Sequence, residues 1–264
     1  MSHTPAELSA LATELFDALE SHRYAPRPSH SGDQLSVDDA YAIQAMQLEK
    51  FTAQGHRIAA IKLGLTDEAQ QQRAGWFAPS FGTLTDQMMI PAAGVLSLSG
   101  GLRPRVEPEI VVTLAREITR AIESREELLS AIADVRVGIE IVDPRYEDSE
   151  FILADAIADN ASAHAGVLGT QTFAPDASEW SAEELVLSID GVDQVRGRGA
   201  ALMGDPLRVV ADVIAERVRL GWVTPAGIAI FTGNVSGKAV NVAVGQTVLV
   251  RGSTLGEVSV RVEA

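Results

Sequence analysis

Four ionisable side chains interrupt stretches that otherwise have the apolar composition of buried β-strands. Lys62 closes an apolar run, Glu107 and Glu109 directly precede another, and Glu140 stands alone within a third. A carboxylate in apolar surroundings is costly unless it pairs with a cation, binds a metal or takes up a proton. We therefore interpret these residues as parts of a metal-dependent active site.

The spacing of the first two glutamates predicts that they share one face of a strand. Residues two apart on a strand point to the same side, so Arg103 and Arg105 should lie on that face too. The two carboxylates need a positive partner, which is either a metal ion or the two arginines in a surface salt-bridge ladder. Pro108 lies between Glu107 and Glu109 and cannot donate a ladder hydrogen bond, so the strand should lie at an edge or carry a bulge there.

Glu140 would supply a third carboxylate from a second strand. Its neighbours Ile139 and Ile141 point the other way, and Gly138 on its own face leaves room for a ligand or another backbone. Pairing with an arginine is the alternative for this residue. Three glutamates with no cysteine and no cluster of histidines offer hard oxygen donors, which favour Mg²⁺ or Mn²⁺ over zinc.

Other candidates have more ordinary explanations beside the functional one. Lys62 could have a lowered pKa or anchor a substrate carboxylate, or its amine could reach solvent from the strand end. Asp86 is either a helix N-cap or an acid near the site. Residues 159–162 (DNAS) could simply cap a helix. His164 is the one histidine in a stretch of buried character, and a lone histidine is more often structural than catalytic.

The first part of the chain predicts two helices. Thr4 provides the N-cap of one helix, and Ser36 provides that of another, which ends at Gly55. We expect residues 1–56 to form an N-terminal helical arm packed on a catalytic β-roll domain of residues 57–264.

From residue 57 onward the pattern changes to short strands with few helices between them. Strands are predicted at residues 57–63, 106–114, 135–142, 185–189, 228–232, 247–251 and 258–262. Asp190 and Gly191 predict a hairpin turn, and further helices should start near Ser124 and Asp205. In the C-terminal third, the alternation of strands and glycine turns predicts a rolled or barrel-like sheet, within an α+β fold.

Composition restricts the classes of function. The chain has 264 residues, 46% of them hydrophobic, which suits one large domain with at most a small appendage. A net charge of −15 argues against nucleic-acid and anionic-membrane partners. The lack of cysteine excludes disulfides, thiolate metal sites and cysteine nucleophiles. With no signal-peptide pattern and no apolar run of about 20 residues, we expect a cytoplasmic protein.

Five short motifs occur in order: residues 62–66 (KLGLT), 81–84 (FGTL), 104–110 (PRVEPEI), 140–146 (EIVDPRY) and 159–162 (DNAS). Together they resemble the 2-keto-4-pentenoate hydratase and 4-oxalocrotonate decarboxylase branch of the fumarylacetoacetate hydrolase superfamily. The likeness runs from about residue 36 to the C-terminus. It implies the superfamily's C-terminal-domain fold, a mixed β-roll or distorted barrel with flanking helices, usually in an oligomer.

The resemblance also implies roles for individual residues. The metal ligands would be Glu107, Glu109 and Glu140, the catalytic residues Lys62 and Asp86, and the substrate-binding residues Lys62, Ser162, Arg145 and Thr232. Substrates would be short 2-oxo or 2-hydroxy-dienoic acids from the meta-cleavage of aromatic rings. Mg²⁺, or Mn²⁺ in its place, would polarise the 2-oxo group. Lys62 would orient the C1 carboxylate or move protons, and Asp86 would assist proton transfer.

Local features favour the decarboxylase within this branch. Ile61 is apolar where hydratases often carry histidine, and residues 143–147 and 225–233 resemble the decarboxylases. The departures from the common pattern are Ala60, His164 and Asp205. They leave the substrate open, and 2-hydroxypenta-2,4-dienoate hydratase is the alternative activity.

Two further hypotheses come from other classes. An acylpyruvate-type C–C hydrolase would need a histidine that activates water, and His164 is the candidate. A non-catalytic subunit that stabilises a partner enzyme would gain nothing from burying Lys62 and three glutamates. The expected partners are a small 2-oxo acid, further copies of the chain in a homo-oligomer, and a sister hydratase or decarboxylase, with neither nucleic acid nor membrane among them.

Overall fold

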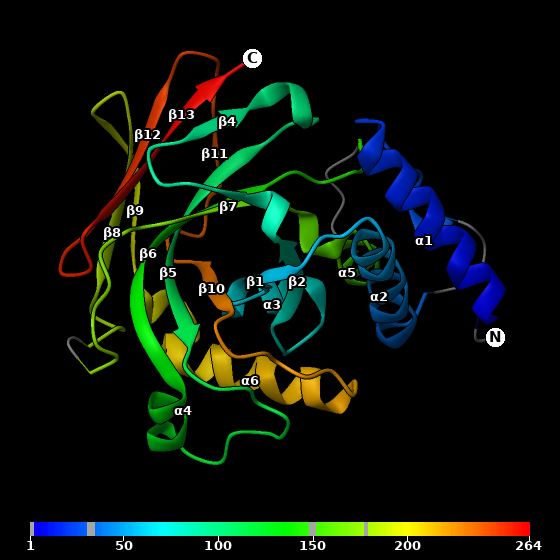
Figure 1. Cartoon of the computed structure of the whole chain (residues 1–264), viewed down its shortest axis with the longest axis horizontal. Coiled ribbons are helices and arrows are strands. Elements are labelled where there is room, and N and C mark those ends of the chain that lie inside the picture. The colour runs from blue at the N-terminus through cyan, green and yellow to red at the C-terminus, as the bar shows by residue number, and fades with distance from the viewer. Residues whose placement is uncertain (1–2, 31–34, 148–151, 177–178) are drawn as a thin grey trace.

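The computed structural model describes residues 3–30, 35–147, 152–176 and 179–264. Helices α1 (Pro5–Glu20) and α2 (Val37–Ala53) pack against each other at one side of the molecule, and α2 also packs on α5 (Leu153–Ala158) (Figure 1). Both predicted N-caps are confirmed, because Thr4 and Ser36 each form a reciprocal capping box with the third helical residue. A separate arm ending at residue 56 stays a prediction.

The larger sheet carries the candidate residues. Its strands follow the order β2-β1-β10-β5-β6-β7-β3, with β11 beside β5. Their bounds are β1 (Ile58–Gly64), β2 (Ser80–Thr85), β3 (Met89–Ile90), β5 (Arg105–Leu114), β6 (Ile132–Val142), β7 (Ala163–Leu168), β10 (Ala229–Asn234) and β11 (Val240–Asn241). The long antiparallel pair β5 and β6 lies in the middle and curls round the others as a half-barrel (Figure 1).

A second sheet packs on the outer side of this pair. It has the order β4-β13-β12-β8-β9, with bounds β4 (Val95–Ser97), β8 (Glu184–Ile189), β9 (Val192–Arg198), β12 (Thr247–Gly252) and β13 (Glu257–Glu263). The valines of β13 occupy alternate positions and are all buried, as expected for a strand with one face against a core. The predicted hairpin turn is confirmed, because Asp190 and Gly191 both have positive φ.

The other helices pack around the larger sheet. Helix α6 (Pro206–Arg219) packs on β1 and β10, α4 (Arg125–Ala131) packs on α6, and α3 (Glu68–Ala74) links β1 to β2. Asp205, one of the departures from the family pattern, is the N-cap of α6. Short 3-10 turns lie at Pro28–His30, Asp86–Met88, Leu98–Gly100, Asn160–Ser162 and Gly199–Ala201. No helix in the described ranges is long and apolar enough to span a bilayer.

Every strand predicted from the sequence is present, with ends shifted by a few residues, and the α+β roll is confirmed. The prediction missed β2, β7 and the short strands β3, β4 and β11. All six residues of β2 are buried, so it lacks the alternation that marks a half-exposed strand. Strand β7 begins with small residues and a histidine, which have weak strand preference.

Of the two arrangements predicted at Pro108, a sheet edge or a bulge, the structure excludes the edge and has a bulge. Strand β5 lies between β10 and β6, and Pro108 pairs with Ile139. The irregularity is on the neighbouring strand, where the β10–β5 register shifts between Phe231 and Asn234. A bulge in β10 therefore accommodates the missing N–H of Pro108.

We predict that Gly233→Ala lowers the free energy of unfolding by about 2–3 kcal/mol. Gly233 lies in this bulge with a φ of +113°, and a Cβ there would lie 2.2 Å from Thr66 Oγ1. The control is Gly237→Ala, which has a φ of +67° and no heavy atom within 4 Å of the added Cβ. It should lose only about 1 kcal/mol. Equal losses in urea denaturation would contradict this account of the bulge.

Candidate active site and metal centre

The strand register brings the three predicted glutamates together. Glu107 and Glu140 are direct partners across β5 and β6, and Glu109, two residues along, points to the same face. One carboxylate oxygen from each lies within 4.8 Å of the others. Glu109 and Glu140 are fully buried, whereas Glu107 is half-buried. Convergence on one point is the arrangement expected for a shared cation.

The alternative of a salt-bridge ladder with arginines is not what the structure has. Among the described residues, no ion pair joins any of the three glutamates to an arginine. Arg103 instead donates to the carbonyls of Tyr146 and Glu147, at 3.2 and 2.8 Å. Its backbone N–H donates to Asp143. The carboxylates therefore remain available to another cation.

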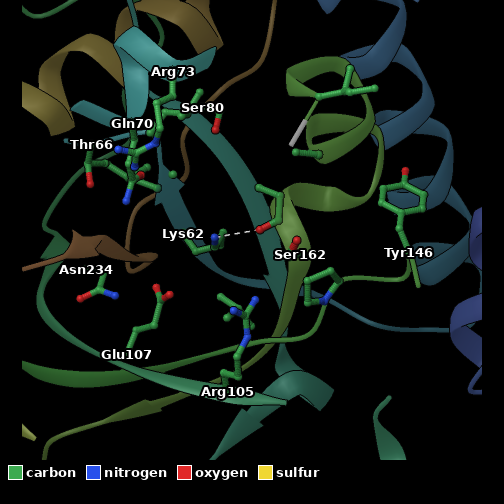
Figure 2. Close-up of a pocket in the computed structure, with 18 of the residues that line it drawn as sticks. Lys62, Thr66, Gln70, Arg73, Ser80, Arg105, Glu107, Tyr146, Ser162 and Asn234 are labelled. Carbon is green, nitrogen blue, oxygen red and sulfur yellow. Dashed lines mark hydrogen bonds between the residues drawn. The ribbon is translucent and has the colours of Figure 1, made fainter. Parts of the chain in front are cut away.

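Lys62 is the cationic side chain that touches this cluster. Its Nζ lies 2.9 Å from Glu140 Oε1 and donates to the carbonyl of Ala161 at 2.9 Å (Figure 2). The side chain is only 5% exposed, so it does not reach solvent from the strand end as the alternative held. Burial lowers the pKa of Lys62, but the charges of Glu140, Glu107 and Glu109 more than offset this effect. The pKa is raised, and the amine stays protonated.

Burial also acts on the carboxyl groups. It raises the pKa of Glu107 to about 7, and the neighbouring charge of Glu140 adds to the effect. Burial and then Glu140 likewise raise the pKa of Glu109, although the N–H of Gly233 donates to its Oε2 at 2.7 Å. The buried atoms Glu109 Oε1 and Glu140 Oε2 have no hydrogen-bond partner among the described residues. These oxygens and the excess negative charge fit a hard divalent cation.

An apolar layer lies beside the carboxylates on the same face of the sheet. It consists of the buried residues Ala60, Leu84, Val111, Ala163, Ala229 and Phe231. A Cβ on Gly138 would lie 2.5 Å from Val111 and 2.9 Å from Phe231, and one on Gly166 would lie 2.8 Å from Phe231. Gly138 therefore admits these side chains rather than the ligand that the sequence suggested. The layer keeps water from one side of the cluster, which strengthens its electrostatic interactions.

Residues 159–162 do more than cap a helix. Asn160, Ala161 and Ser162 all have left-handed backbone, with φ of 52°, 51° and 58°. Such a conformation costs about 1–2 kcal/mol for each non-glycine residue. The Asn160 side chain holds it in place by accepting from Thr83 N at 2.7 Å and donating to Thr83 O at 2.8 Å. The turn thereby offers the Ala161 carbonyl to Lys62.

A cavity of about 620 Å³ opens above Lys62 and Glu107. Ser162 lines it, as the resemblance implied, while Asn234 lies near Glu107 (Figure 2). Sequence reasoning missed several other lining residues: Arg27, Gln70, Arg73, Ser80 and Tyr146. They come from loops, a short helix and the first residue of β2, where periodicity carries no signal. Of the predicted residues, Lys62, Glu107 and Ser162 meet in one cavity.

Asp86 lies away from this cavity. Its carboxylate accepts from Arg57 N at 3.0 Å and from Arg57 Nε at 3.1 Å, outside the cavity lining. These hydrogen bonds lower the pKa of Asp86. The role in proton transfer that the resemblance implied for Asp86 stays a prediction, since the ion pair with Arg57 occupies its carboxylate.

Arg145, Thr232 and His164 also lie outside the cavity lining. Arg145 is buried in an ion pair with Asp159, and Thr232 Oγ1 donates to the carbonyl of Ile110 at 2.9 Å. His164 Nδ1 lies 3.9 Å from Asp143. The first two side chains hold neighbouring backbone in place, and the substrate contacts that the resemblance implied for them stay predictions.

Comparisons with known proteins agree with this geometry. The family profile "Fumarylacetoacetate (FAA) hydrolase C-terminal" matches residues 57–263. The chain is 34% identical over 230 residues to a 2-keto-4-pentenoate hydratase of Paraburkholderia xenovorans (strain LB400), covering 87% of the chain and 86% of that relative. It is 32% identical over 231 residues to a 4-oxalocrotonate decarboxylase of Pseudomonas putida, covering 86% of each.

A solved structure is also similar over nearly the whole chain. It is the 4-oxalocrotonate decarboxylase from Pseudomonas putida G7 complexed with magnesium and adipate. The TM-score is 0.94 at 29% identity, and the match covers 99% of both chains.

We predict that Glu107→Gln abolishes the rise in melting temperature that a divalent cation gives the wild-type protein. After chelation the variant should melt no lower than wild type, because one of three repelling carboxylates has gone. Glu123→Gln, which changes an exposed acid, is the control.

In wild type the affinity for Mg²⁺ should rise from pH 6 to pH 8, since Glu107, with a pKa of about 7, must lose its proton to bind. An unchanged cation response in Glu107→Gln would contradict the site.

Proposed function

This chain belongs to the fumarylacetoacetate hydrolase family, and we propose that it is a Mg²⁺-dependent lyase that decarboxylates 4-oxalocrotonate. The observation that carries the proposal is the meeting of three converging glutamates with a buried, protonated Lys62 at one end of a cavity. The wider substrate class is that of short 2-oxo and 2-hydroxy-dienoic acids.

The residues present fit the metal. Glu107, Glu109 and Glu140 would hold Mg²⁺ with carboxylate oxygens, two of which have no other described partner. When bound, the cation supplies Lewis-acid polarisation of the substrate's 2-oxo group. Mn²⁺ should substitute, because it accepts the same oxygen donors.

Lys62 would act as a hydrogen-bond donor rather than a general base. Its ion pair with Glu140, with Nζ 2.9 Å from Oε1, favours the ammonium form, which can orient the C1 carboxylate and face the 2-oxo oxygen. In the reaction the C5–C6 bond breaks and CO₂ departs. The bonding electrons move through the C3–C4 double bond onto the 2-oxo oxygen, where the ammonium of Lys62 lowers the energy of the developing negative charge.

The ligand of the similar solved structure supports the decarboxylase. Adipate is a six-carbon dicarboxylate like 4-oxalocrotonate, and the structure that contains it matches 99% of this chain. The hydratase of 2-hydroxypenta-2,4-dienoate is the second candidate, because the chain is also 34% identical to 2-keto-4-pentenoate hydratases. An acylpyruvate hydrolase fits less well, because the histidine it would need, His164, does not line the cavity.

The assembly is a further part of the proposal. We propose a homo-oligomer, with association to a sister hydratase or decarboxylase as the finer possibility. Both rest on the family resemblance, and light scattering after size-exclusion chromatography, with and without the sister enzyme, tests them.

We predict that the purified protein with Mg²⁺ removes the ultraviolet absorbance of 4-oxalocrotonate and releases one CO₂ for each molecule consumed. Lys62→Met should lower kcat/KM by at least about 100-fold, because a charge-stabilising donor has gone. Lys238→Met, at an exposed lysine, should leave the rate unchanged. Consumption of 2-hydroxypenta-2,4-dienoate without CO₂ release would favour the hydratase. Turnover of neither compound by metal-loaded protein would contradict both.

A further inference from the structure

The cavity is rich in cationic side chains although the chain as a whole is strongly acidic. Its cationic lining residues are Arg27, Lys62, Arg73, Arg103 and Arg105. Three of these already have partners. Lys62 contacts Glu140, Arg27 lies 3.6 Å from Asp155, and Arg103 donates to two carbonyls.

Arg73 and Arg105 differ from the others. Within the described part of the chain neither guanidinium forms a hydrogen bond or an ion pair, although both line the cavity. Arg105 is half-buried and Arg73 is exposed. A guanidinium presents a fork of N–H donors that matches a carboxylate in two places. Two unpaired forks in one cavity therefore suit a ligand with two carboxylates.

The two arginines lie on opposite sides of the cavity. Arg105 precedes Glu107 by two residues on β5 and so shares its face, which places Arg105 at the metal end. Figure 2 shows Arg73 on the other side, grouped with Gln70, Thr66 and Ser80. These residues come from the loop after β1, from α3 and from the start of β2. Lys62 lies between the two groups.

Helix α3 is fixed well enough to hold a side chain in place. Asp67 caps its first turn by accepting from Gln70 N at 3.0 Å. The buried Gln71 donates from Nε2 to the carbonyl of Leu65 at 2.8 Å. Gly75 ends the helix with left-handed backbone, directly after the turn that carries Arg73. Arg73 thus extends from an anchored segment.

We propose that Arg73, assisted by Gln70 and Ser80, binds the second carboxylate of a dicarboxylic 2-oxo acid, the one remote from the metal. The inference deepens the proposed function and rests on it, because it assumes that the 2-oxo acid end lies at the three glutamates. It makes Arg73 the residue that separates dicarboxylic from monocarboxylic substrates.

This assignment has a kinetic consequence. The remote carboxylate is the one that leaves as CO₂, so its ion pair with Arg73 exists in the ground state and is lost as the reaction proceeds. An interaction of that kind lowers KM without raising kcat. Because Arg73 is exposed, the pair is screened by solvent and does not hold the leaving group strongly.

The test measures binding of two matched ligands to Mg²⁺-loaded protein by calorimetry. 2-Oxoadipate and 2-oxohexanoate have the same chain length and 2-oxo acid end, and only the first has a second carboxylate. Wild type should bind 2-oxoadipate roughly tenfold more tightly. Arg73→Met should remove that preference and leave the affinity for 2-oxohexanoate unchanged, and Arg73→Lys should retain part of the preference. Arg208→Met, an exposed arginine on α6, controls for the loss of surface charge.

Turnover separates this inference from the proposed function. Arg73→Met should raise KM for 4-oxalocrotonate roughly tenfold without lowering kcat. If wild type turns over 4-oxalocrotonate but Arg73→Met keeps both the KM and the dicarboxylate preference, the subsite is wrong and the function stands. If wild type binds both ligands equally, the second carboxylate makes no ion pair in the cavity. The remote end of the ligand then lies beside the apolar lining residues Val142 and Pro144, and the subsite is again wrong. If wild type prefers 2-oxoadipate through Arg73 yet does not decarboxylate, the proposed reaction fails and the subsite stands.

Discussion

The central constraint on this structure is electrostatic. Three carboxylates that repel one another lie on one face of a curled sheet, and one lysine forms an ion pair with one of them. Glu107 and Glu140 are direct strand partners, so the β5–β6 register alone fixes their approach, and Glu109 follows from the two-residue repeat. Burial removes the water that would otherwise screen them. Lys62 offsets part of the charge, and the raised pKa values of Glu107 and Glu109 indicate how much remains. A divalent cation is the partner that fits this arrangement.

The surrounding backbone departs from regular geometry where it serves this cluster. The bulge in β10 aims the N–H of Gly233 at Glu109, and the left-handed turn at Asn160–Ser162 brings a carbonyl to Lys62. Both conformations are unfavourable in isolation, and packing and hydrogen bonds to neighbouring strands maintain them. The same turn gives Ser162 its place in the cavity lining.

The cluster could be predicted from the sequence because charged residues in apolar strands are rare and side-chain alternation is regular. Glu107, Glu109, Glu140 and Lys62 all follow from that reasoning. The same logic left an edge and a bulge open at Pro108, and the structure has a bulge, with the extra residue on the neighbouring strand β10. Asp86 and Arg145 came from family likeness, and their ion pairs with Arg57 and Asp159 depend on contacts between distant segments that no local pattern encodes. Arg73 was not predicted, since loops and short helices carry no periodic signal.

The most direct test of the central claim is a crystal structure of the protein soaked with Mn²⁺, with anomalous diffraction measured at the manganese edge. The account predicts one strong anomalous peak bounded by carboxylate oxygens of Glu107, Glu109 and Glu140, and its loss in a crystal of Glu140→Gln. The account would be contradicted if wild-type crystals had no anomalous peak at the three glutamates, or if the peak there were equally strong in Glu140→Gln.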